Sequence, residues 1–343
     1  MGRLTGWIRN HLPTQRRLIQ LYAALLYNAH LKGYITGEIF TGKTKSVCVP
    51  GFNCYSCPGA VGACPLGALQ NAIAASGSRT PVYVLGILML YGITLGRTIC
   101  GYLCPLGLLQ ELVHKIPTFK VKKSRVTHVL SYLKYVILAI FVLAVPFWYA
   151  MQSYPVPAFC KYICPAGTFE GAIGLLSNPA NSDKFSMLGI LFTRKFVILL
   201  LITLTCVFIY RAFCRFLCPL GAIYGLFAKI AVVGVKVEAP KCTNCGRCTA
   251  QCPMDIRHAG DHECIHCGKC IDVCPTGAIS LKAGKITLRG PELAATPEQK
   301  RRGRKIRLTA WAVALAVLAG ALWYFNRPEP TTAEPEASTA TTS

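Results

Sequence analysis

The sequence predicts an α-helical membrane protein with about five spans, in which two parallel two-span repeats are joined to a small α+β domain. Three observations support this fold class. The 343-residue chain is 53% hydrophobic and 15% charged, whereas charged residues make up roughly 25% of an ordinary soluble domain. A cysteine-containing segment near residue 100 recurs near residue 214, and eight of the 19 cysteines lie between residues 241 and 275.

Residues 241–275 contain two successive C-x2-C-x2-C-x3-C-P runs. Such runs bind two [4Fe-4S] clusters, and the fourth cysteine of each run is a ligand of the other cluster. We therefore predict two sets of ligands: Cys242, Cys245, Cys248 and Cys274 for the first cluster, and Cys264, Cys267, Cys270 and Cys252 for the second. Short β-type segments complete a two-cluster ferredoxin domain of α+β class over residues 232–290, at Val233–Val237, Ile279–Leu281 and Ile286–Leu288.

Other cysteine chemistries explain this stretch less well. A zinc ribbon needs four sulfurs for one metal ion, which leaves the third cysteine of each run and the following Cys-Pro unexplained. No histidine follows a C-x-x-C pair, which argues against covalent haem attachment.

The first predicted repeat occupies residues 18–127, after a basic N-terminus at 1–17. Its first candidate span is Leu18–Phe40, in which His30 and Lys32 would either form a quinone or proton site or face a protein interior. The second candidate, Pro81–Gly96, is short for a bilayer, and we extend it to Ile99.

The second predicted repeat occupies residues 128–231 and contains the spans Val129–Ala150 and Lys195–Phe213. After the ferredoxin domain, a basic linker at 291–307 leads to a fifth transmembrane helix at 308–325. The remaining segment, 326–343, is too rich in Pro, Thr and Glu to pack, so we predict a disordered tail.

The distribution of Lys and Arg predicts the orientation. The chain has a formal net charge of +23, and in so apolar a sequence this charge favours a membrane partner over nucleic acid. The N-terminus, residues 115–125, the ferredoxin domain and residues 300–307 hold most of the basic residues, and five spans place all four on one side. We therefore predict a multi-pass protein of the cytoplasmic membrane with a cytoplasmic ferredoxin domain and N-terminus and an outer tail. Arg194 and Lys195, at the outer end of the fourth span, go against this rule.

An internal repeat predicts a further cluster at the inner face. The segments LGRTICGYLCPLGLLQELVHKI and IYRAFCRFLCPLGAIYGLFAKI align without a gap. A four-residue step places two thiols on one face of a helical turn, and parallel repeats bring the two motifs side by side. The predicted ligands of this inner membrane cluster are Cys100, Cys104, Cys214 and Cys218. The alternatives are buried cysteines that act as small apolar residues or two dithiols. The neighbouring Arg97, Arg211 and Arg215 would offset cluster charge or anchor the interface.

A weaker repeat predicts an outer site. The segment ACPLGALQNAIA aligns with ICPAGTFEGAIG. Cys64 then aligns with Cys164, and Cys160 aligns with Ala60, which is not a cysteine. The fourth ligand is then Cys57 or Cys54, and we favour Cys57 because it is nearer in sequence. The predicted outer set is Cys57, Cys64, Cys160 and Cys164, with Cys48 and Cys54 left as redox thiols or a disulfide pair at which electrons leave. Cys206 has no partner motif and is expected to pack in the core.

These motifs resemble the membrane polyferredoxin family with C-x3-C-P repeats, which includes proteins of the NapH and NosR types. The resemblance covers about residues 15–290 and depends on CGYLCPLG, CRFLCPLG and the double ferredoxin run. It implies membrane electron transfer through [4Fe-4S] clusters. The chain departs from the NapH type in its extra outer cysteines, in the third C-x3-C-P at Cys160 and in its fifth span.

Our leading hypothesis is an electron conduit that is one component of an oxidoreductase system rather than a stand-alone enzyme. Electrons would move from the ferredoxin clusters to the inner cluster and then to the outer cluster or dithiol. The partners would be a redox donor protein, an acceptor protein and, in one variant, a quinone. Two alternatives remain: a redox-sensing or maturation factor for a partner metalloenzyme, and a quinone-linked oxidoreductase subunit.

Overall fold

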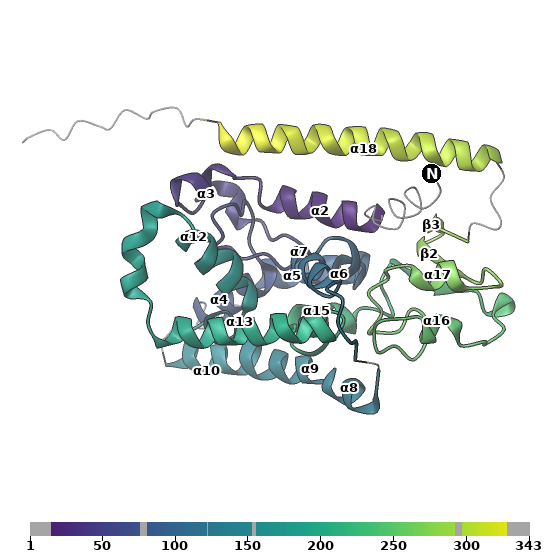
Figure 1. Ribbon diagram of the computed structural model, residues 1–343, viewed down its shortest axis with the longest axis horizontal. Coiled ribbons are helices and arrows are strands. Elements are labelled where there is room, and N and C mark those ends of the chain that lie inside the picture. Colours follow the sequence, from purple (N-terminus) through teal and green to yellow (C-terminus); the bar gives the residue numbers. More distant parts are fainter. Residues whose placement is uncertain (1–14, 76–80, 122, 153–155, 292–296, 328–343) are drawn as a thin grey trace, which may run out of the picture.

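Long helices run in roughly the same direction in the computed structural model, and a small domain with three strands lies at one end of them (Figure 1). The structure describes residues 15–75, 81–121, 123–152, 156–291 and 297–327. The predicted disordered tail and most of the predicted N-terminal segment therefore lie outside the described residues.

Three helical segments within the described residues are long and apolar enough to cross a membrane. They are Arg125–Met151, Ile190–Phe208 and Lys305–Asn326, and they correspond to the predicted third, fourth and fifth spans. Between 6% and 28% of their apolar windows is buried, so most of their apolar side chains face outward. The first segment is built from α8 (Arg125–Leu130), α9 (Leu133–Ile137), a π-helix η2 (Leu138–Ala144) and α10 (Val145–Met151); the others are α13 (Ile190–Phe208) and the end of α18 (Pro297–Asn326).

The predicted first span, Leu18–Phe40, is wrong as a single helix. The chain forms α2 (Gln15–Tyr27), turns, and then forms α3 (Lys32–Thr36). Side-chain polarity explains the break. Asn28 Nδ2 donates to Asn53 Oδ1 at 3.0 Å, and His30 Nδ1 lies 3.1 Å from the carbonyl oxygen of Pro58. These contacts fix the turn to the first cysteine loop.

The second predicted span is also shorter than predicted. Helix α5 (Val82–Thr94) has 13 residues, fewer than the roughly twenty that cross a bilayer. Gly96 then adopts a positive φ of 50°, which ends the helix before the first inner cysteine motif.

The internal repeat is present in the structure. Helices α6 (Thr98–Tyr102) and α7 (Pro105–Val113) occupy the same aligned positions as α14 (Ala212–Phe216) and α15 (Pro219–Leu226). In both copies a cysteine with extended backbone precedes a proline at the first helical position, where the missing N–H costs no hydrogen bond. The remaining elements on the other side of the core are η1 (Lys43–Ser46), α4 (Pro65–Ala75), α11 (Ala158–Tyr162), η3 (Gly167–Ile173), α12 (Gly174–Leu176) and η4 (Pro179–Met187).

The small domain has an antiparallel sheet of order β1-β2-β3, with β1 (Val233–Val237), β2 (Ile279–Ala283) and β3 (Ile286–Arg289). Val235 pairs with Leu281, and a bulge lies between Leu281 and Lys282. The cysteine loops carry η5 (Ala239–Lys241), α16 (Arg247–Ala250) and α17 (Lys269–Val273). Gly246 and Gly268 precede α16 and α17 with φ of 70° and 80°, a conformation that favours glycine and lets each loop turn back.

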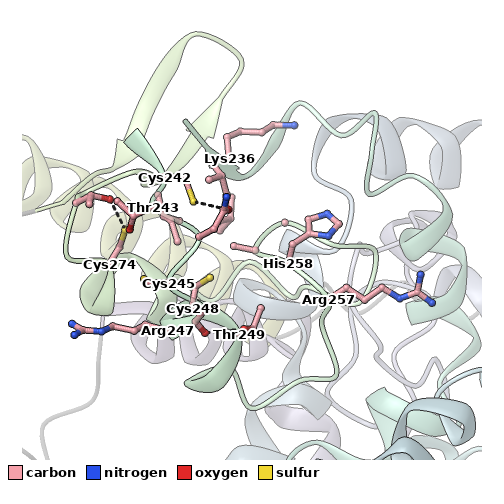
Figure 2. Close-up of a pocket in the computed structure, with 18 of the residues that line it drawn as sticks. Lys236, Cys242, Thr243, Cys245, Arg247, Cys248, Thr249, Arg257, His258 and Cys274 are labelled. Atoms are coloured by element: carbon pink, nitrogen blue, oxygen red, sulfur yellow. Dashed lines mark hydrogen bonds between the residues drawn. The ribbon is translucent and has the colours of Figure 1, made fainter. Parts of the chain in front are cut away.

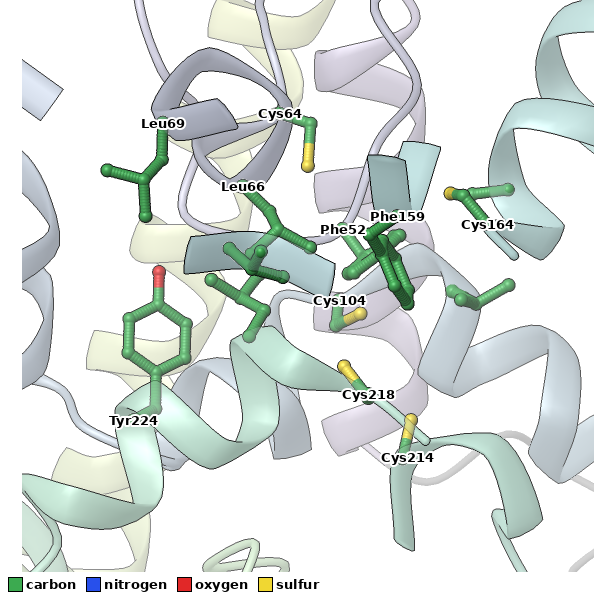
Figure 3. Close-up of a cluster of buried hydrophobic side chains, with 14 of the residues drawn as sticks. Phe52, Cys64, Leu66, Leu69, Cys104, Phe159, Cys164, Cys214, Cys218 and Tyr224 are labelled. Atoms are coloured by element: carbon green, nitrogen blue, oxygen red, sulfur yellow. The ribbon is translucent and has the colours of Figure 1, made fainter. Parts of the chain in front are cut away.

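One apolar core joins the two repeats, and it contains cysteines of both membrane motifs (Figure 3). Phe52, 2% exposed, packs in T-shaped contacts with Phe159 and Phe213 at centroid distances of 6.4 and 5.7 Å. In Figure 3, Phe52 and Phe159 lie between two groups of thiols. Cys64 and Cys164 are on one side, and Cys104, Cys214 and Cys218 are on the other.

We predict that Phe52→Ala lowers the free energy of unfolding by about 3–5 kcal/mol, because it leaves a cavity at the centre of this core. Phe185→Ala is the matched control, since Phe185 is 52% exposed and should change stability by no more than about 0.5 kcal/mol. Denaturant unfolding in detergent measures both, and equal losses would place Phe52 outside the cooperative core.

Candidate iron–sulfur sites

The first ferredoxin set lines a cavity of about 480 Å³. Figure 2 shows the sulfurs of Cys242, Cys245, Cys248 and Cys274 around it. The structure thus brings the last cysteine of the second run to the first three of the first run, which is the grouping predicted from the crossover rule. Lys236, Arg247 and Arg257 surround the same cavity.

The second ferredoxin set lies closer to the helices and is more buried. Cys252 and Cys270 each interact electrostatically with Cys264 and Cys267. Burial, and then the neighbouring sulfurs, raise the pKa of the Cys252 and Cys270 thiols to about 12. The backbone N–H of His266 donates to Cys264 Sγ at 3.4 Å. Thiols of this kind release their protons when a metal binds them.

The loops of both ferredoxin sets contain a residue with a positive φ at the same position. Asn244 and His266, each one residue before the second cysteine of a run, have φ of 51° and 52°. His266 is fully buried, and its Nδ1 accepts the N–H of Val235 at 2.9 Å. Burial, and then the charges of Arg97 and Lys236, lower its pKa to about 4, so His266 is a neutral residue that attaches the loop to β1.

The four predicted inner thiols meet at the start of α7 and α15. Cys100, Cys104, Cys214 and Cys218 line one narrow cavity together with Arg97, and its open volume is about 10 Å³. Gln110 Nε2 donates to Cys214 Sγ at 3.0 Å, and the N–H of Gly221 donates to Cys218 Sγ at 3.4 Å. Arg97 Nε is buried there without a hydrogen-bond partner.

Two buried carboxylates neutralise the arginines beside the inner thiols. Glu111 pairs with Arg211 at 2.7 Å and with Arg16 at 2.5 Å. Glu263, in the ferredoxin domain, pairs with Arg97 at 2.8 Å and with Lys134. Burial alone would raise the pKa of each carboxyl, but the paired cations lower the pKa of both Glu111 and Glu263 to about 2. Both stay ionised at neutral pH.

The outer thiols also meet, but with a different fourth member than predicted. A cavity of about 220 Å³ is lined by Cys54, Cys64, Cys160 and Cys164. Cys57, which the sequence favoured, is absent from this lining, and its Sγ lies 3.0 Å from Tyr34 Oη. The outer loop turns away after Cys54 because the N–H of Cys54 donates to Glu170 Oε2 at 2.7 Å.

Cys48 and Cys54, predicted as redox thiols or a disulfide pair, are not joined by a disulfide. All 19 cysteines lie in the described residues, and all are free thiols. Cys48 is buried and forms a β-bridge with Ala63, whereas Cys54 lines the outer cavity. Cys206 is 1% exposed and packs against Ala212 and Phe216, as expected for a core residue.

Several residues that bind the outer thiols were missed in the sequence. Gln70 Nε2 donates to Cys160 Sγ at 3.3 Å. Lys195 Nζ lines the outer cavity and donates to the carbonyl oxygen of Cys160 at 3.2 Å, which explains a cation that the positive-inside rule did not. Burial raises the pKa of Glu170 to about 7. The signal was available in the repeat: the sixth residue after each Cys-Pro cysteine is polar, namely Gln70, Gln110, Glu170 or Tyr224.

Residues that pack between them connect the four sets of thiols. Phe52 lines both the inner and the outer cavity and packs in one apolar core with Cys104 of the inner set and Cys64 of the outer set. At the other end, Cys100 packs in one apolar cluster with Cys252 and Cys267. A second cluster joins thiols of both ferredoxin sets, namely Cys248, Cys270 and Cys274. The sets therefore form a continuous series from the ferredoxin domain to the far end of the helices.

Among the described residues, no three His, Cys, Asp or Glu side chains converge closely enough to hold a single metal ion. In each of the three cavities, four thiols face a shared space instead.

Comparison with known proteins supports iron–sulfur binding in both parts of the chain. One 4Fe-4S binding domain matches residues 80–124, 135–180 and 192–238, and a second matches residues 261–280. An uncharacterised protein of Methanocaldococcus jannaschii is 30% identical over 201 residues, which cover 57% of this chain and 74% of that protein. The chain belongs to the membrane polyferredoxin family of the NapH/NosR type.

Two further relatives of this polyferredoxin have descriptive names. YccM of Escherichia coli, a proposed electron transport protein, is 25% identical over 212 residues, which cover 58% of this chain and 55% of YccM. The regulatory protein NosR of Stutzerimonas stutzeri is 29% identical over 190 residues, which cover 53% of this chain and 23% of NosR. No solved structure matches the chain.

We predict that Cys54→Ala removes about four irons per chain, one cube, whereas Cys57→Ala retains them. The reason is that Cys54 lines the outer cavity and Cys57 contacts Tyr34 instead. Iron and acid-labile sulfide, measured on anaerobically purified protein, test both variants. The opposite pattern would restore Cys57 as the outer ligand.

Proposed function

We propose that this polyferredoxin relays electrons between its ferredoxin domain and the opposite face of the membrane. The observation that carries this proposal is the series of four thiol sets, in which Phe52 lines both the inner and the outer cavity. A protein that only docked a ferredoxin domain on a membrane would need no thiol cavity at the far end.

The chemistry of each donor set fits a [4Fe-4S] cluster, which needs four thiolates. Each set supplies four thiols, and the sulfurs already accept N–H bonds from residues such as Gly221, Gln110 and Gln70. Two buried donors lack partners in the cavities: Arg97 Nε at the inner set and Asn53 Nδ2 at the outer set. The inner cavity is narrow, so its thiols must move apart to admit a cube.

The bound clusters would supply reversible one-electron transfer, and the chain's own residues would set where and at what potential it occurs. Arg97, Arg211 and Lys195 place positive charge beside sites that become more negative on reduction. Apolar residues such as Phe52 exclude water from the space between the inner and outer sets. Cys245 is exposed, which leaves the first ferredoxin set accessible to a redox partner.

We further propose that the ferredoxin domain is cytoplasmic and that the outer set of Cys54, Cys64, Cys160 and Cys164 faces the opposite side. The basic residues of the ferredoxin domain and of the start of α18 support this orientation through the positive-inside rule. The partners would then be a cytoplasmic donor and an extracytoplasmic acceptor, or the reverse pair.

The second candidate function is a redox-sensing or maturation factor. Two observations favour it: the similarity to the regulatory protein NosR, and the two buried outer thiols, Cys48 and Cys57, that belong to no set. Quinone chemistry has less support, because His30 contacts Pro58 and packs on Phe40 at a centroid distance of 5.2 Å.

The experiment is a count of iron and sulfide per chain, with EPR of the reduced protein, in the wild type and in the double variant Cys104→Ala, Cys218→Ala. About sixteen irons in the wild type and about twelve in the variant are expected, four for each cube. About eight irons in both proteins would mean that the membrane thiols bind none, which would contradict the relay.

A further inference from the structure

The two inner motifs differ in sequence at the positions where the ferredoxin domain contacts them. In the gapless alignment, Glu111 of the first repeat corresponds to Gly225 of the second, and Gly101 corresponds to Arg215. The cysteines, the prolines and the first arginines, Arg97 and Arg211, are the same in both copies. Ten of the 22 aligned residues are identical, and two of the twelve differences change the contacts with the ferredoxin domain.

The first repeat supplies its own carboxylate, Glu111, which neutralises an arginine of the second repeat. Glu111 lies on α7 and pairs with the fully buried Arg211 of the second repeat. The same carboxylate accepts hydrogen bonds from Arg16 of α2 and from Tyr210. This corner needs no group from the ferredoxin domain.

In the second repeat, the corresponding carboxylate is missing and the ferredoxin domain supplies one. A Cβ at Gly225 would lie 3.9 Å from Cδ of Arg97, 3.6 Å from the carbonyl oxygen of His262 and 3.0 Å from Tyr135 Oη. The space beside α15 is thus occupied by the His262–Glu263 backbone. Glu263, 1% exposed, pairs there with Arg97 and Lys134, which are 1% and 0% exposed.

The second difference between the repeats serves the same contact. A Cβ at Gly101 would lie 2.1 Å from the carbonyl oxygen of Ile265, so only glycine admits the 264–267 loop at this point. On the other repeat, Arg215 pairs with the buried Asp255 of the ferredoxin domain. Both of these departures from the repeat therefore fit residues 255–265 of the ferredoxin domain.

We propose that Glu263 is the docking residue of the ferredoxin domain: it occupies the place left by Gly225 and substitutes for the carboxylate that Glu111 supplies in the other repeat. This contact admits the domain in one orientation, because the first repeat has its own carboxylate and offers no matching space. It places Cys264 and Cys267 beside Cys100, with the first ferredoxin set on the outside. The role of this docking in ordering the thiol sets rests on the proposed relay.

Charge makes the contact selective. Without Glu263, the buried cations Arg97 and Lys134 would lose the carboxylate with which both form ion pairs, and an unpaired buried charge is strongly unfavourable. A buried pair of this kind specifies one arrangement even where it adds little net stability. The docked ferredoxin domain thus neutralises Arg97 and Lys134 through Glu263.

The test is hydrogen exchange on the full chain in detergent, with cluster content measured in the same samples. Glu263→Gln removes the docking charge, and Gly225→Glu places a second carboxylate in the same space while leaving every ferredoxin residue unaltered. Amides of residues 261–267 and of α6 are expected to exchange at least tenfold faster in both variants. Gly225→Ala controls for the added Cβ, and Glu111→Gln removes a matched charge that the ferredoxin domain does not contact.

Glu111→Gln should speed exchange in α2 and leave residues 261–267 protected. Wild-type protection of residues 261–267 in both Glu263→Gln and Gly225→Glu would overturn the proposal, as would an equal loss in Glu111→Gln or Gly225→Ala. The exchange readout does not require the membrane clusters. A wild type with about eight irons would therefore contradict the relay, whereas hydrogen exchange would still test the docking role of Glu263.

Discussion

The packing of Phe52 between the inner and outer thiols is the constraint on which the proposed relay depends. Phe52 lines both cavities and lies in one apolar core with Cys64 and Cys104. Phe52 fills the space between them with its ring and contacts Phe159 and Phe213. In the proposed relay, this one buried loop residue would set the spacing of the sites and exclude water from the gap.

Buried charge is the second organising feature. Arg97, Arg211 and Lys134 are almost completely buried in an apolar protein, and each is paired with a carboxylate. In the proposed relay, cations so placed would counter the negative charge of thiolate-bound iron, while the carboxylates keep them compatible with burial. The positions of Glu111 and Glu263 thus connect the packing of the helices to the chemistry of the inner thiols.

The sequence predicted those parts of the structure that depend on local spacing. The C-x2-C-x2-C runs and the gapless repeat predicted which thiols lie together in the first ferredoxin set and at the inner motifs, because both patterns fix geometry within a few residues. The first span was wrong because its polar residues Asn28 and His30 have partners, Asn53 and Pro58, in a distant loop.

Contacts between distant segments could not be predicted in this way. Proximity in sequence favoured Cys57 as the fourth outer thiol, but the hydrogen bond from Cys54 to Glu170, 116 residues away, determines which cysteine faces the cavity. The pairing of Glu263 with Arg97, 166 residues apart, likewise becomes visible only in the folded structure.

The most direct test of the relay is electron flow across a sealed membrane. The anaerobic protein is reconstituted into vesicles that enclose cytochrome c, and the membrane-impermeant reductant dithionite is added outside. The relay predicts reduction of the enclosed cytochrome c, lost in Cys54→Ala and absent from protein-free vesicles. Full reduction of the protein's clusters without any reduction of the enclosed cytochrome c would contradict the account.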